Sequence, residues 1–378
     1  MNTRSSPANT TARGTAINIH GNAICHNTRT IKNKLAPTVR LLAMVKANAY
    51  GHGATDVIPF MQDADAFGVA SFAEAVQIAP ITQKPIVLIE GAFHQDEWQQ
   101  AIMQDFGCVL HSFEQLAWAL EYMPQDGTFA RSIWLKYNTG MNRLGFGDDK
   151  IIQVAKALHD KGYGLILTSH FACADEPTHP LNQQQINKFN HALQSIRQFA
   201  PNTKGSLCNS AGVFAFGNEH HDWVRTGIAL YGSSPFVDIS AAQLGLLPAM
   251  TLSAKIMATH TLQAGESVGY GSLWTADKPS RIGVVSIGYG DGYPRVVQGA
   301  MVSVIHGTST HSVAIIGRVA MDMLMIDLTD MPTLTINDTV ILWGSTPSID
   351  DIARCANTIG YELMCRLTHR PTRTIINS

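Results

Sequence analysis

Eight short apolar runs, separated by segments with helical periodicity, fill the chain between residues 41 and 231 and most restrict its fold. They cover residues 41–46, 66–70, 86–89, 107–110, 132–137, 164–169, 204–208 and 223–231. Between the fifth and sixth runs, for example, apolar residues recur with helical spacing from Asp148 onward. Strands that alternate with helices favour a parallel sheet, and eight of them over roughly 200 residues predict a (β/α)8 barrel. A doubly wound open sheet is the competing architecture, but no GxGxxG turn follows the first run.

The pattern changes near residue 247, where strand-like runs follow one another without helices between them. These runs cover residues 254–261, 281–287, 302–305, 313–316, 323–328 and 339–343, and one helix is expected at 349–359. We therefore predict an α/β fold in which an N-terminal barrel, residues 14–247, precedes a mainly β domain, residues 248–378. A polar stretch at 1–13 is expected to be a disordered tail. The alternating strand at 15–19, which a helix at 21–34 follows, could join either domain.

Composition narrows the class of protein and its location. The chain has 378 residues, of which 45% are hydrophobic, and its formal net charge of -2 gives no electrostatic case for nucleic acid. The six cysteines show neither paired nor metal-site spacing, so we expect reduced thiols and no metal. The first residues contain no apolar signal-peptide core, and no run approaches the roughly 20 apolar residues of a membrane helix. These features predict a cytoplasmic protein that does not enter a membrane.

Polar residues gather where the eight predicted strands end. Read in order, these positions hold Lys46, Ser71, Glu90, His111, Lys136, His170, Asn209 with Ser210, and Arg225 with Tyr231. In a barrel, the C-terminal ends of the strands line the active site. The pattern therefore predicts a site at one mouth of the barrel without naming its reaction.

The first of these strand ends lies in the segment LLAMVKANAYGHG, residues 41–53. Lys46 ends a buried strand and opens into a loop that carries Tyr50, an imidazole and glycines. A lysine held there can lose its proton through desolvation and attack an aldehyde, whereas a lysine that extends from a strand end into solvent stays charged. The whole segment closely resembles the pyridoxal-phosphate lysine motif of alanine racemases, and further matches run along nearly all of the chain.

This resemblance implies a cofactor, a reaction and an assembly. Pyridoxal 5'-phosphate would be bound to Lys46, and a homodimer with active sites shared between its chains would interconvert L-alanine and D-alanine. Two bases would move the α-proton, Tyr270 for the L enantiomer and Lys46 for the D enantiomer. Tyr270 lies in VGYGSLW, which matches the family segment with the catalytic tyrosine. A tyrosine beside glycines is otherwise an ordinary packing residue with a solvated hydroxyl. The D-alanine would supply peptidoglycan or be catabolised.

The segment KYNTGMNRLGF, residues 136–146, resembles the carboxylate-binding loop of the family. Arg143 would bind the substrate carboxylate, because its planar guanidinium matches a carboxylate bidentately; by spacing alone, a surface ion pair is the alternative. Lys136 matches a lysine that is carbamylated in many relatives and then orients the arginine. His170 would lie against the cofactor ring and support the arginine beneath it, although a histidine at a strand end is often only structural.

A phosphate cup and a ring contact complete the implied cofactor site. By resemblance, the cup contains Tyr50, Asn209, Ser210, the backbone amides of Gly227 and Ile228, and Tyr361 from the segment GYELMCR. Ser210 stands where a helix is expected to start, so an N-cap is its alternative role. Arg225 matches an arginine that faces the pyridine nitrogen, whereas a buried salt bridge is its ordinary interpretation. Because arginine does not give up its proton as a carboxylic acid would, the ring would stay unprotonated.

Loops of the β domain would line the route of the substrate. GYGDGYPR from Gly288 and GRVAMDM from Gly317 match family loops and indicate Tyr289, Met321 and Asp322. Position 320 is alanine where many relatives have cysteine, and the end of the chain reads RPTR instead of RVPR. Both departures bear on substrate preference more than on reaction type. A serine or broad-specificity racemase, a pyridoxal-phosphate carrier protein and a Schiff-base aldolase are the alternatives.

Overall fold

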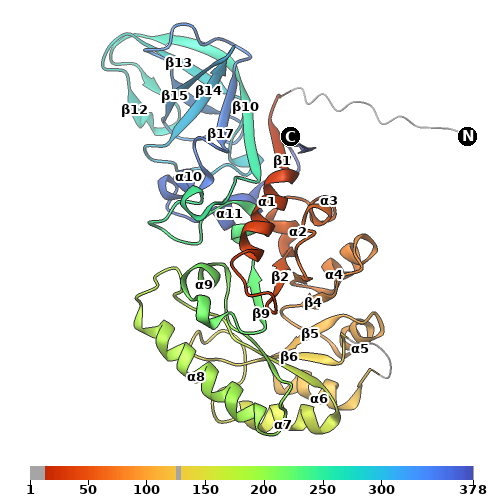
Figure 1. The fold of residues 1–378 in the computed structure, drawn as a ribbon. Coiled ribbons are helices and arrows are strands. Elements are labelled where there is room, and N and C mark those ends of the chain that lie inside the picture. Colours follow the sequence, from red (N-terminus) through yellow and green to blue (C-terminus); the bar gives the residue numbers. More distant parts are fainter. Residues whose placement is uncertain (1–12, 125–128, 378) are drawn as a thin grey trace, which may run out of the picture. The chain divides into compact units, whose positions relative to one another are not determined.

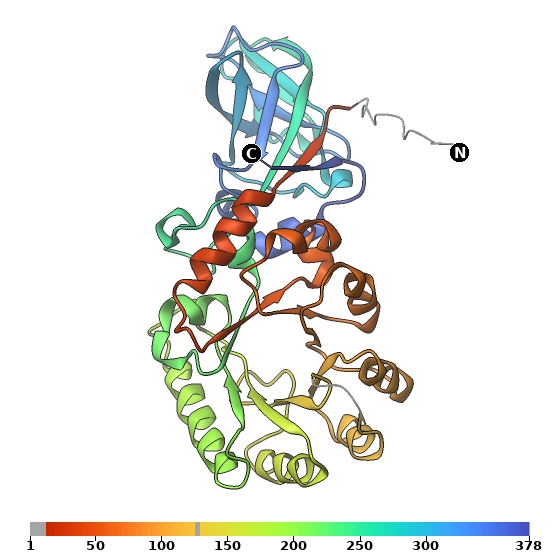
Figure 2. The same ribbon diagram turned by 45° about the vertical axis from the view of Figure 1, so that its right-hand side comes forward.

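The structure, a computed structural model, describes residues 13–124 and 129–377 of the chain. These residues divide into two compact units, which we describe separately (Figure 1, Figure 2). The barrel unit covers residues 24–246, and the β unit contains the residues before 24 together with those from 247 onward. Of the tail expected at 1–13, residues 1–12 lie outside the described residues.

Eight parallel strands form the sheet of the barrel unit, in the order β8-β7-β6-β5-β4-β3-β2-β9. They are β2 Arg40–Met44, β3 Ala66–Val69, β4 Ile86–Leu88, β5 Gly107–Leu110, β6 Ser132–Lys136, β7 Gly164–Thr168, β8 Lys204–Ser206 and β9 Trp223–Thr226. Each strand overlaps one of the predicted runs, so the predicted barrel architecture is confirmed. The eighth run was wrong in length, because Gly227 (φ -125°, ψ -85°) leaves the strand conformation and Ile228–Tyr231 forms a 3-10 turn, η4.

Strands β8 and β9 close the barrel through single hydrogen bonds in place of a regular ladder. The amide of Asp222 donates to the carbonyl of Gly205 (3.1 Å), and the amide of Arg225 donates to the carbonyl of Cys208 (2.9 Å). These bonds satisfy backbone groups that an open sheet would leave at its edges. They also hold Arg225 against the residues that follow β8.

Helices cover the outer face of the barrel sheet (Figure 2). They are α3 Ala54–Val57, α4 Phe72–Ile78, α5 Gln95–Met103, α6 Phe113–Glu121, α7 Ile151–Lys161, α8 Pro180–Arg197 and α9 Ser210–Ala215, with the short turn α2 Lys46–Tyr50 at the end of β2. Along α7, Ile151, Val154, Ala155 and Leu158 are buried, as the helical spacing of this segment predicts. Helix α1 Gly21–Lys32 joins the two units in sequence and is two residues shorter than the expected 21–34.

The β unit is built on one mixed sheet with the order β13-β16-β15-β14-β17-β10-β1-β18, in which β10 also pairs with β13. Its strands are β1 Ala16–His20, β10 Met250–Leu262, β13 Ser280–Val285, β14 Met301–His306, β15 Ser309–Ile316, β16 Leu324–Asp327, β17 Thr339–Trp343 and β18 Thr372–Ile376, and a hairpin adds β11 Ser267–Val268 and β12 Trp274–Thr275. Strand β1 runs antiparallel to β10 and parallel to β18. Residues from both ends of the sequence therefore complete this sheet.

The C-terminal helix expected at 349–359 begins where predicted but ends four residues early, and a second helix that was not predicted follows it. Helix α10, Ile349–Cys355, ends before Asn357, whose left-handed backbone (φ 52°) breaks the helical path. Helix α11, Gly360–Arg366, follows it. The sequence pattern missed α11 and the strand β18 because both are short and only partly apolar.

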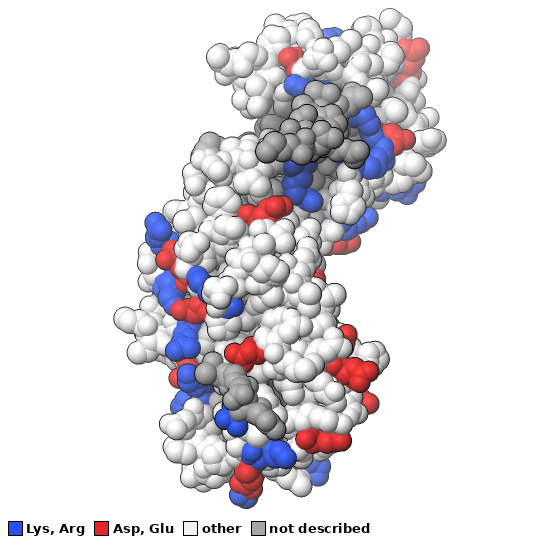
Figure 3. Space-filling view, turned by 90° about the vertical axis from the view of Figure 1, so that its right-hand side faces the viewer, with Lys and Arg blue, Asp and Glu red and all other residues white. Residues whose placement is uncertain are grey.

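Charges of both signs occur on the surface of the molecule. On the face drawn in Figure 3, lysines and arginines occur together with aspartates and glutamates, and much of the surface carries neither. Within residues 13–124 and 129–377, no helix combines the length and the apolar character needed to cross a bilayer. The same residues contain no group of three or more histidine, cysteine, aspartate or glutamate side chains placed to hold a metal ion.

Candidate active site

The C-terminal ends of the barrel strands bring a set of basic side chains together. The positive charges of Lys136, Arg225, Arg143 and Lys46 all act on His170. Lys136, Arg143 and His170 also line one small cavity of about 10 Å³, together with Thr139 and Ser169. The structure therefore gathers four of the predicted strand-end residues, Lys46, Lys136, His170 and Arg225, together with Arg143 from the predicted carboxylate-binding loop.

Lys46 opens a left-handed turn directly after β2. The four residues from Ala47 to Tyr50 all have positive φ, between 51° and 54°. Such a turn costs roughly 1–2 kcal/mol for each non-glycine residue, so other contacts must stabilise it. The amide of Gly51 donates to the carbonyl of Ala47 (3.0 Å), and the amide of Ala54 donates to Oδ1 of Asn48 (2.8 Å).

Glu74 is a further support of this turn that the sequence analysis missed. Its Oε1 accepts the amide of Ala47 (2.7 Å), the residue after Lys46, and its Oε2 accepts the amide of Ala70 (2.8 Å) at the end of β3. One carboxylate thus ties two neighbouring strand ends together. The pattern Ser71-x-x-Glu74, in which the Ser71 hydroxyl accepts the Glu74 amide (3.3 Å), is a helix-start signal that could have indicated a hydrogen bond from Glu74 to nearby backbone amides.

Tyr50 reaches from the left-handed turn to the end of β9. A Cβ atom on Gly227 would lie 2.2 Å from the Tyr50 hydroxyl oxygen, so only glycine allows this approach. The Gly227 amide donates to Oγ of Ser210 (3.0 Å). Asn209, and not Ser210, is the N-cap of α9, because its side chain accepts the Gly212 amide (2.9 Å). Tyr50, Ser210 and Gly227 therefore form one polar cup, and the alternative role of Ser210 as the N-cap is excluded.

Arg225 is buried, with 6% of its surface exposed, and is held by acceptors at the ends of β7 and β8. Its Nη1 donates to the carbonyl (2.8 Å) and the hydroxyl (2.6 Å) of Ser206, and its Nη2 donates to the carbonyl of Ser169. Burial lowers the pKa of the guanidinium to about 10, so it remains charged at neutral pH. The buried salt bridge expected as its ordinary role is absent among the described residues, since these acceptors are all uncharged.

His170 lies beside Arg225, with its Nδ1 3.4 Å from Nη2 of the arginine. A guanidinium can only donate, so Nδ1 must be the acceptor and the ring proton must sit on Nε2. Burial and the surrounding cations lower the pKa of His170 well below its usual value. His170 is therefore a neutral imidazole in this site.

Lys136 is a further group of this site whose charged form is disfavoured. Burial, followed by the charges of Arg225 and Arg143, holds the pKa of Lys136 well below its usual value. The exposed Arg143 beside it has no ion pair within the described part of the chain, and the same holds for Lys46. Arg225, which is buried, also has no acidic partner within the described residues. Buried charges are normally paired, so this group of cations indicates a place for anionic ligands such as a phosphate or a carboxylate.

The other predicted residues belong to the β unit, where three loops meet. The Tyr289 amide donates to the carbonyl of Ala320 (3.0 Å), which places Tyr289 beside Met321. A Cβ on Gly269 would lie 2.7 Å from Cε of Met325, so the loop of Tyr270 packs against β16, the strand that follows the loop of Met321. Tyr270 and Met321 are 70% and 54% exposed. Asp322 pairs with Arg370, and Tyr361 lies on α11.

The fold and the site together define a class of protein. A lysine at the C-terminal mouth of a (β/α)8 barrel, beside a glycine-lined polar cup and unpaired cations, is typical of an enzyme that holds a phosphorylated aldehyde through that lysine. Residues 19–235 match the family description "Alanine racemase, N-terminal domain", and residues 249–375 match "Alanine racemase, C-terminal domain". The chain belongs to the alanine racemase family.

Individual relatives agree with this assignment over almost the whole chain. The alanine racemase of Psychrobacter sp. (strain PRwf-1) is 50% identical over 373 residues, which cover 96% of this chain and all of the relative. A solved alanine racemase from Acinetobacter baumannii is 41% identical, with a TM-score of 0.90 over 96% of this chain and 100% of that chain. A third, from Bartonella henselae and solved with covalently bound pyridoxal phosphate, is 28% identical, with a TM-score of 0.84 over 96% and 99% of the two chains.

Proposed function

We propose that this chain interconverts L-alanine and D-alanine with pyridoxal 5'-phosphate bound to Lys46. The observation that carries the proposal is the barrel mouth, where Lys46 stands among cations that have no carboxylate partner within the described residues. A phosphorylated cofactor and the carboxylate of an amino acid supply the anions that this site lacks. The relatives named above, all alanine racemases, support the reaction, and the Bartonella henselae enzyme supports the cofactor.

The residues present fit this cofactor. Lys46 would hold its aldehyde carbon. Tyr50, Asn209, Ser210, the amides of Gly227 and Ile228, and Tyr361 would hold its phosphate, and Arg225 and His170 would hold its ring. The close approach of the Tyr50 hydroxyl to Gly227, which a Cβ on residue 227 would block, is the observation that supports the phosphate cup. When bound, the cofactor draws electrons from the α-carbon of the attached amino acid and makes the α-proton acidic.

Arg225 holds the ring without protonating it. Its hydrogen bonds to Ser206 and Ser169 fix the guanidinium, and its pKa of about 10 is far above neutral pH, so it donates a hydrogen bond and keeps its proton. His170 accepts from Arg225 through Nδ1 and adds no charge, because it is neutral. Because neither residue gives the ring a proton, the ring withdraws electrons less strongly than a protonated ring would.

Arg143 binds the substrate carboxylate, and Lys136 orients Arg143. Because the pKa of Lys136 is well below its usual value, its amine is available as a nucleophile. Its Nζ attacks the carbon of CO₂, a new N–C bond forms, and one proton leaves to solvent. The resulting carbamate is an anion beside Arg143, which provides the ion pair that the unmodified cavity lacks.

Two bases on opposite faces of the substrate move the proton, and the second comes from another copy of the chain. Lys46 takes the α-proton of D-alanine, and Tyr270 of the partner subunit takes that of L-alanine. Exposed apolar side chains of the β unit, among them Leu273, Val296 and Met321, support a partner surface of a twofold homodimer. Tyr289, Met321 and Asp322 line the route of the substrate.

The cysteines support a cytoplasmic location. All six are free, and Cys108 and Cys208 are buried. Burial raises the pKa of both thiols to about 12, which keeps them in the unreactive thiol form. Free thiols are typical of proteins in a reducing compartment.

Complementation between two inactive variants tests the lysine, the tyrosine and the shared site together. Lys46→Ala and Tyr270→Ala should each retain almost no racemase activity. After subunit exchange, half of the dimers are mixed, and each mixed dimer has one site with both bases intact, so activity should recover to roughly a quarter of wild type. Exchange is verified with differently tagged chains. No recovery in verified mixed dimers would contradict the shared site.

A further inference from the structure

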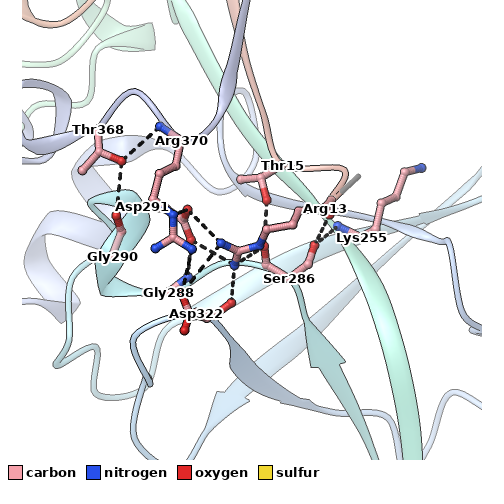
Figure 4. Close-up of polar contacts among 10 residues, drawn as sticks. All are labelled: Arg13, Thr15, Lys255, Ser286, Gly288, Gly290, Asp291, Asp322, Thr368 and Arg370. Atoms are coloured by element: carbon pink, nitrogen blue, oxygen red, sulfur yellow. Dashed lines mark hydrogen bonds and ion pairs between the residues drawn. The ribbon is translucent and has the colours of Figure 1, made fainter. Parts of the chain in front are cut away.

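Four charged residues that are distant in sequence form one cluster in the β unit: Arg13, Asp291, Asp322 and Arg370 (Figure 4). We refer to them as the β-unit ion cluster. Arg13 donates from Nη1 and Nη2 to the two carboxylate oxygens of Asp291 (3.4 Å each). Nε of Arg370 lies 3.3 Å from Oδ1 of Asp291, and Nη2 of Arg370 donates to Oδ1 of Asp322 (2.7 Å). Asp291 is therefore held by two guanidinium groups.

Asp291 is the buried centre of this cluster. Only 1% of its side chain is exposed, whereas Asp322 is half exposed. Its Oδ2 also accepts the amide of Gly288 (2.9 Å), and its carbonyl accepts the amide of Thr368 (3.1 Å). Asp291 thus fixes its own loop and links it to residues near both ends of the described chain.

The loop that Asp291 fixes is joined to the loop of Met321 by backbone contacts. The amide of Tyr289 donates to the carbonyl of Ala320 (3.0 Å), and the amide of Gly290 donates to the carbonyl of Met321 (2.8 Å). A Cβ on Gly288 would lie 2.3 Å from the Ala320 carbonyl oxygen. The two loops therefore pack backbone against backbone, and a displacement of one must displace the other.

Glycine is also required where the cluster meets this loop. A Cβ on Gly290 would lie 2.2 Å from Nη1 of Arg370, so the guanidinium packs directly on the loop backbone. Asp322 follows Met321 directly and pairs with the same arginine. Arg370 thus spans from the buried carboxylate of Asp291 to the outer carboxylate of Asp322.

We propose that Asp291 is the positioning residue that sets Tyr289 and Met321 for the selection of alanine over serine. Asp291 is almost fully buried, so it acts through these two side chains and not by contact with the substrate. The inference rests on the proposed function, in which Tyr289 and Met321 line the substrate route. It assigns to Asp291, the aspartate of GYGDGYPR, a role in specificity that lies outside the catalytic bases.

The test compares Asp291→Asn with a matched control, Asp338→Asn. Asn keeps the size of the side chain and an acceptor for Gly288, but it loses the charge that holds Arg13 and Arg370. Asp338 is also a mostly buried aspartate of the β unit, paired with His306 (3.0 Å), but it lies outside the cluster. We expect Asp291→Asn to increase deuterium uptake in peptides spanning 286–293 and 317–324 and to lower the alanine-to-serine ratio of kcat/KM about 5- to 10-fold. Asp338→Asn should change neither.

A third variant, Met321→Ala, separates failure of the inference from failure of the proposed substrate route. If Met321→Ala changes the alanine-to-serine ratio and Asp291→Asn does not, the positioning role of Asp291 is wrong while the substrate route stands. If neither variant changes the ratio, the proposed place of Met321 is wrong, and the inference falls with it. A ratio that shifts equally in Asp291→Asn and Asp338→Asn would make Asp291 a general stability residue and would also overturn the inference.

Discussion

The barrel mouth and the β-unit ion cluster each contain one buried charged side chain, Arg225 and Asp291, but they balance its charge in opposite ways. In the cluster, Arg13 and Arg370 face Asp291 and Asp322. In the barrel mouth, the groups that act on Lys136 besides burial are two further cations. A buried charge that is paired within the chain stabilises a shape, whereas one that is left unpaired lowers stability and provides binding energy for an anion. Charge balance therefore separates the region that binds ligands from the region that supports it.

Replacing one of the cations of the barrel mouth by a carboxylate should break this contrast most strongly. Arg225→Glu replaces a donor that keeps its proton with an acid that can protonate the cofactor ring, and it removes the hydrogen bonds to Ser206. We expect racemisation to slow by roughly 100-fold, about 3 kcal/mol, and pyruvate formation per turnover to rise. Chiral chromatography and a pyruvate assay measure the two products.

The matched control is Arg225→Lys, which keeps the positive charge and should keep pyruvate formation near the wild-type level. If Arg225→Glu forms no more pyruvate per turnover than wild type, Arg225 is only structural. The absorbance of the bound cofactor shows separately whether each variant still binds it.

Replacing Lys136, a lysine without an acidic partner within the described residues, should stabilise the fold but lower the activity. Because the pKa of Lys136 is well below its usual value of 10.5, the unfolded chain binds more protons than the folded chain between the folded-state pKa and 10.5. The stability of the wild type therefore rises with pH in this window and is lost as the pH falls. In CO₂-free buffer, Lys136→Met should gain about 1–4 kcal/mol at pH 7 and less near pH 10.

Thermal unfolding at the two pH values measures this gain, and kcat/KM for alanine should fall in the same variant because Arg143 loses its support. A Lys136→Met protein that is less stable than wild type at pH 7 would mean that the amine is compensated within the chain. The contrast between the two regions would then not hold.

The smallest effect is expected at Glu74, a carboxylate at the edge of the mouth that binds backbone amides and no cation. Glu74→Gln keeps one acceptor but loses the charged hydrogen bond to Ala47, so it should cost about 1 kcal/mol and lower kcat/KM for alanine a few-fold. Glu97→Gln is the matched control, because Glu97 also accepts a backbone amide, that of Phe93 (2.9 Å), at the start of a barrel helix. Equal losses of activity in both variants would remove the special role of Glu74.

The sequence predicted the strands of the barrel because each is buried on both faces and therefore reads as a continuous apolar run. It predicted the residues of the mouth because strand ends in a barrel meet at one face. The left-handed turn after Lys46 was not predictable, since its support by Glu74 comes from 27 residues away. The β-unit ion cluster was not predictable either, because Arg13 and Asp291 are 278 residues apart and no local pattern links them.

The end of the C-terminal helix was predicted wrongly for a related reason. An apolar spacing that continued past residue 355 predicted one helix, but Asn357 takes a left-handed conformation, and the chain starts a second helix at Gly360. A single residue with this backbone ends a helix regardless of the spacing around it. Local conformation and long-range pairing are the two kinds of information that periodicity does not contain.

The placement of β1 has a consequence for synthesis on the ribosome. β1, residues 16–20, pairs with β10 at 250–262 and with β18 at 372–376, whereas the barrel unit is one continuous segment. β1 must therefore wait for β10 and β18 before both of its edges are paired, while the barrel between them can form its sheet as it is made. A ribosome stalled before residue 372 would carry a complete barrel sequence and an N-terminal strand without its parallel neighbour. Nascent-chain length thus decides which of the two units can be complete.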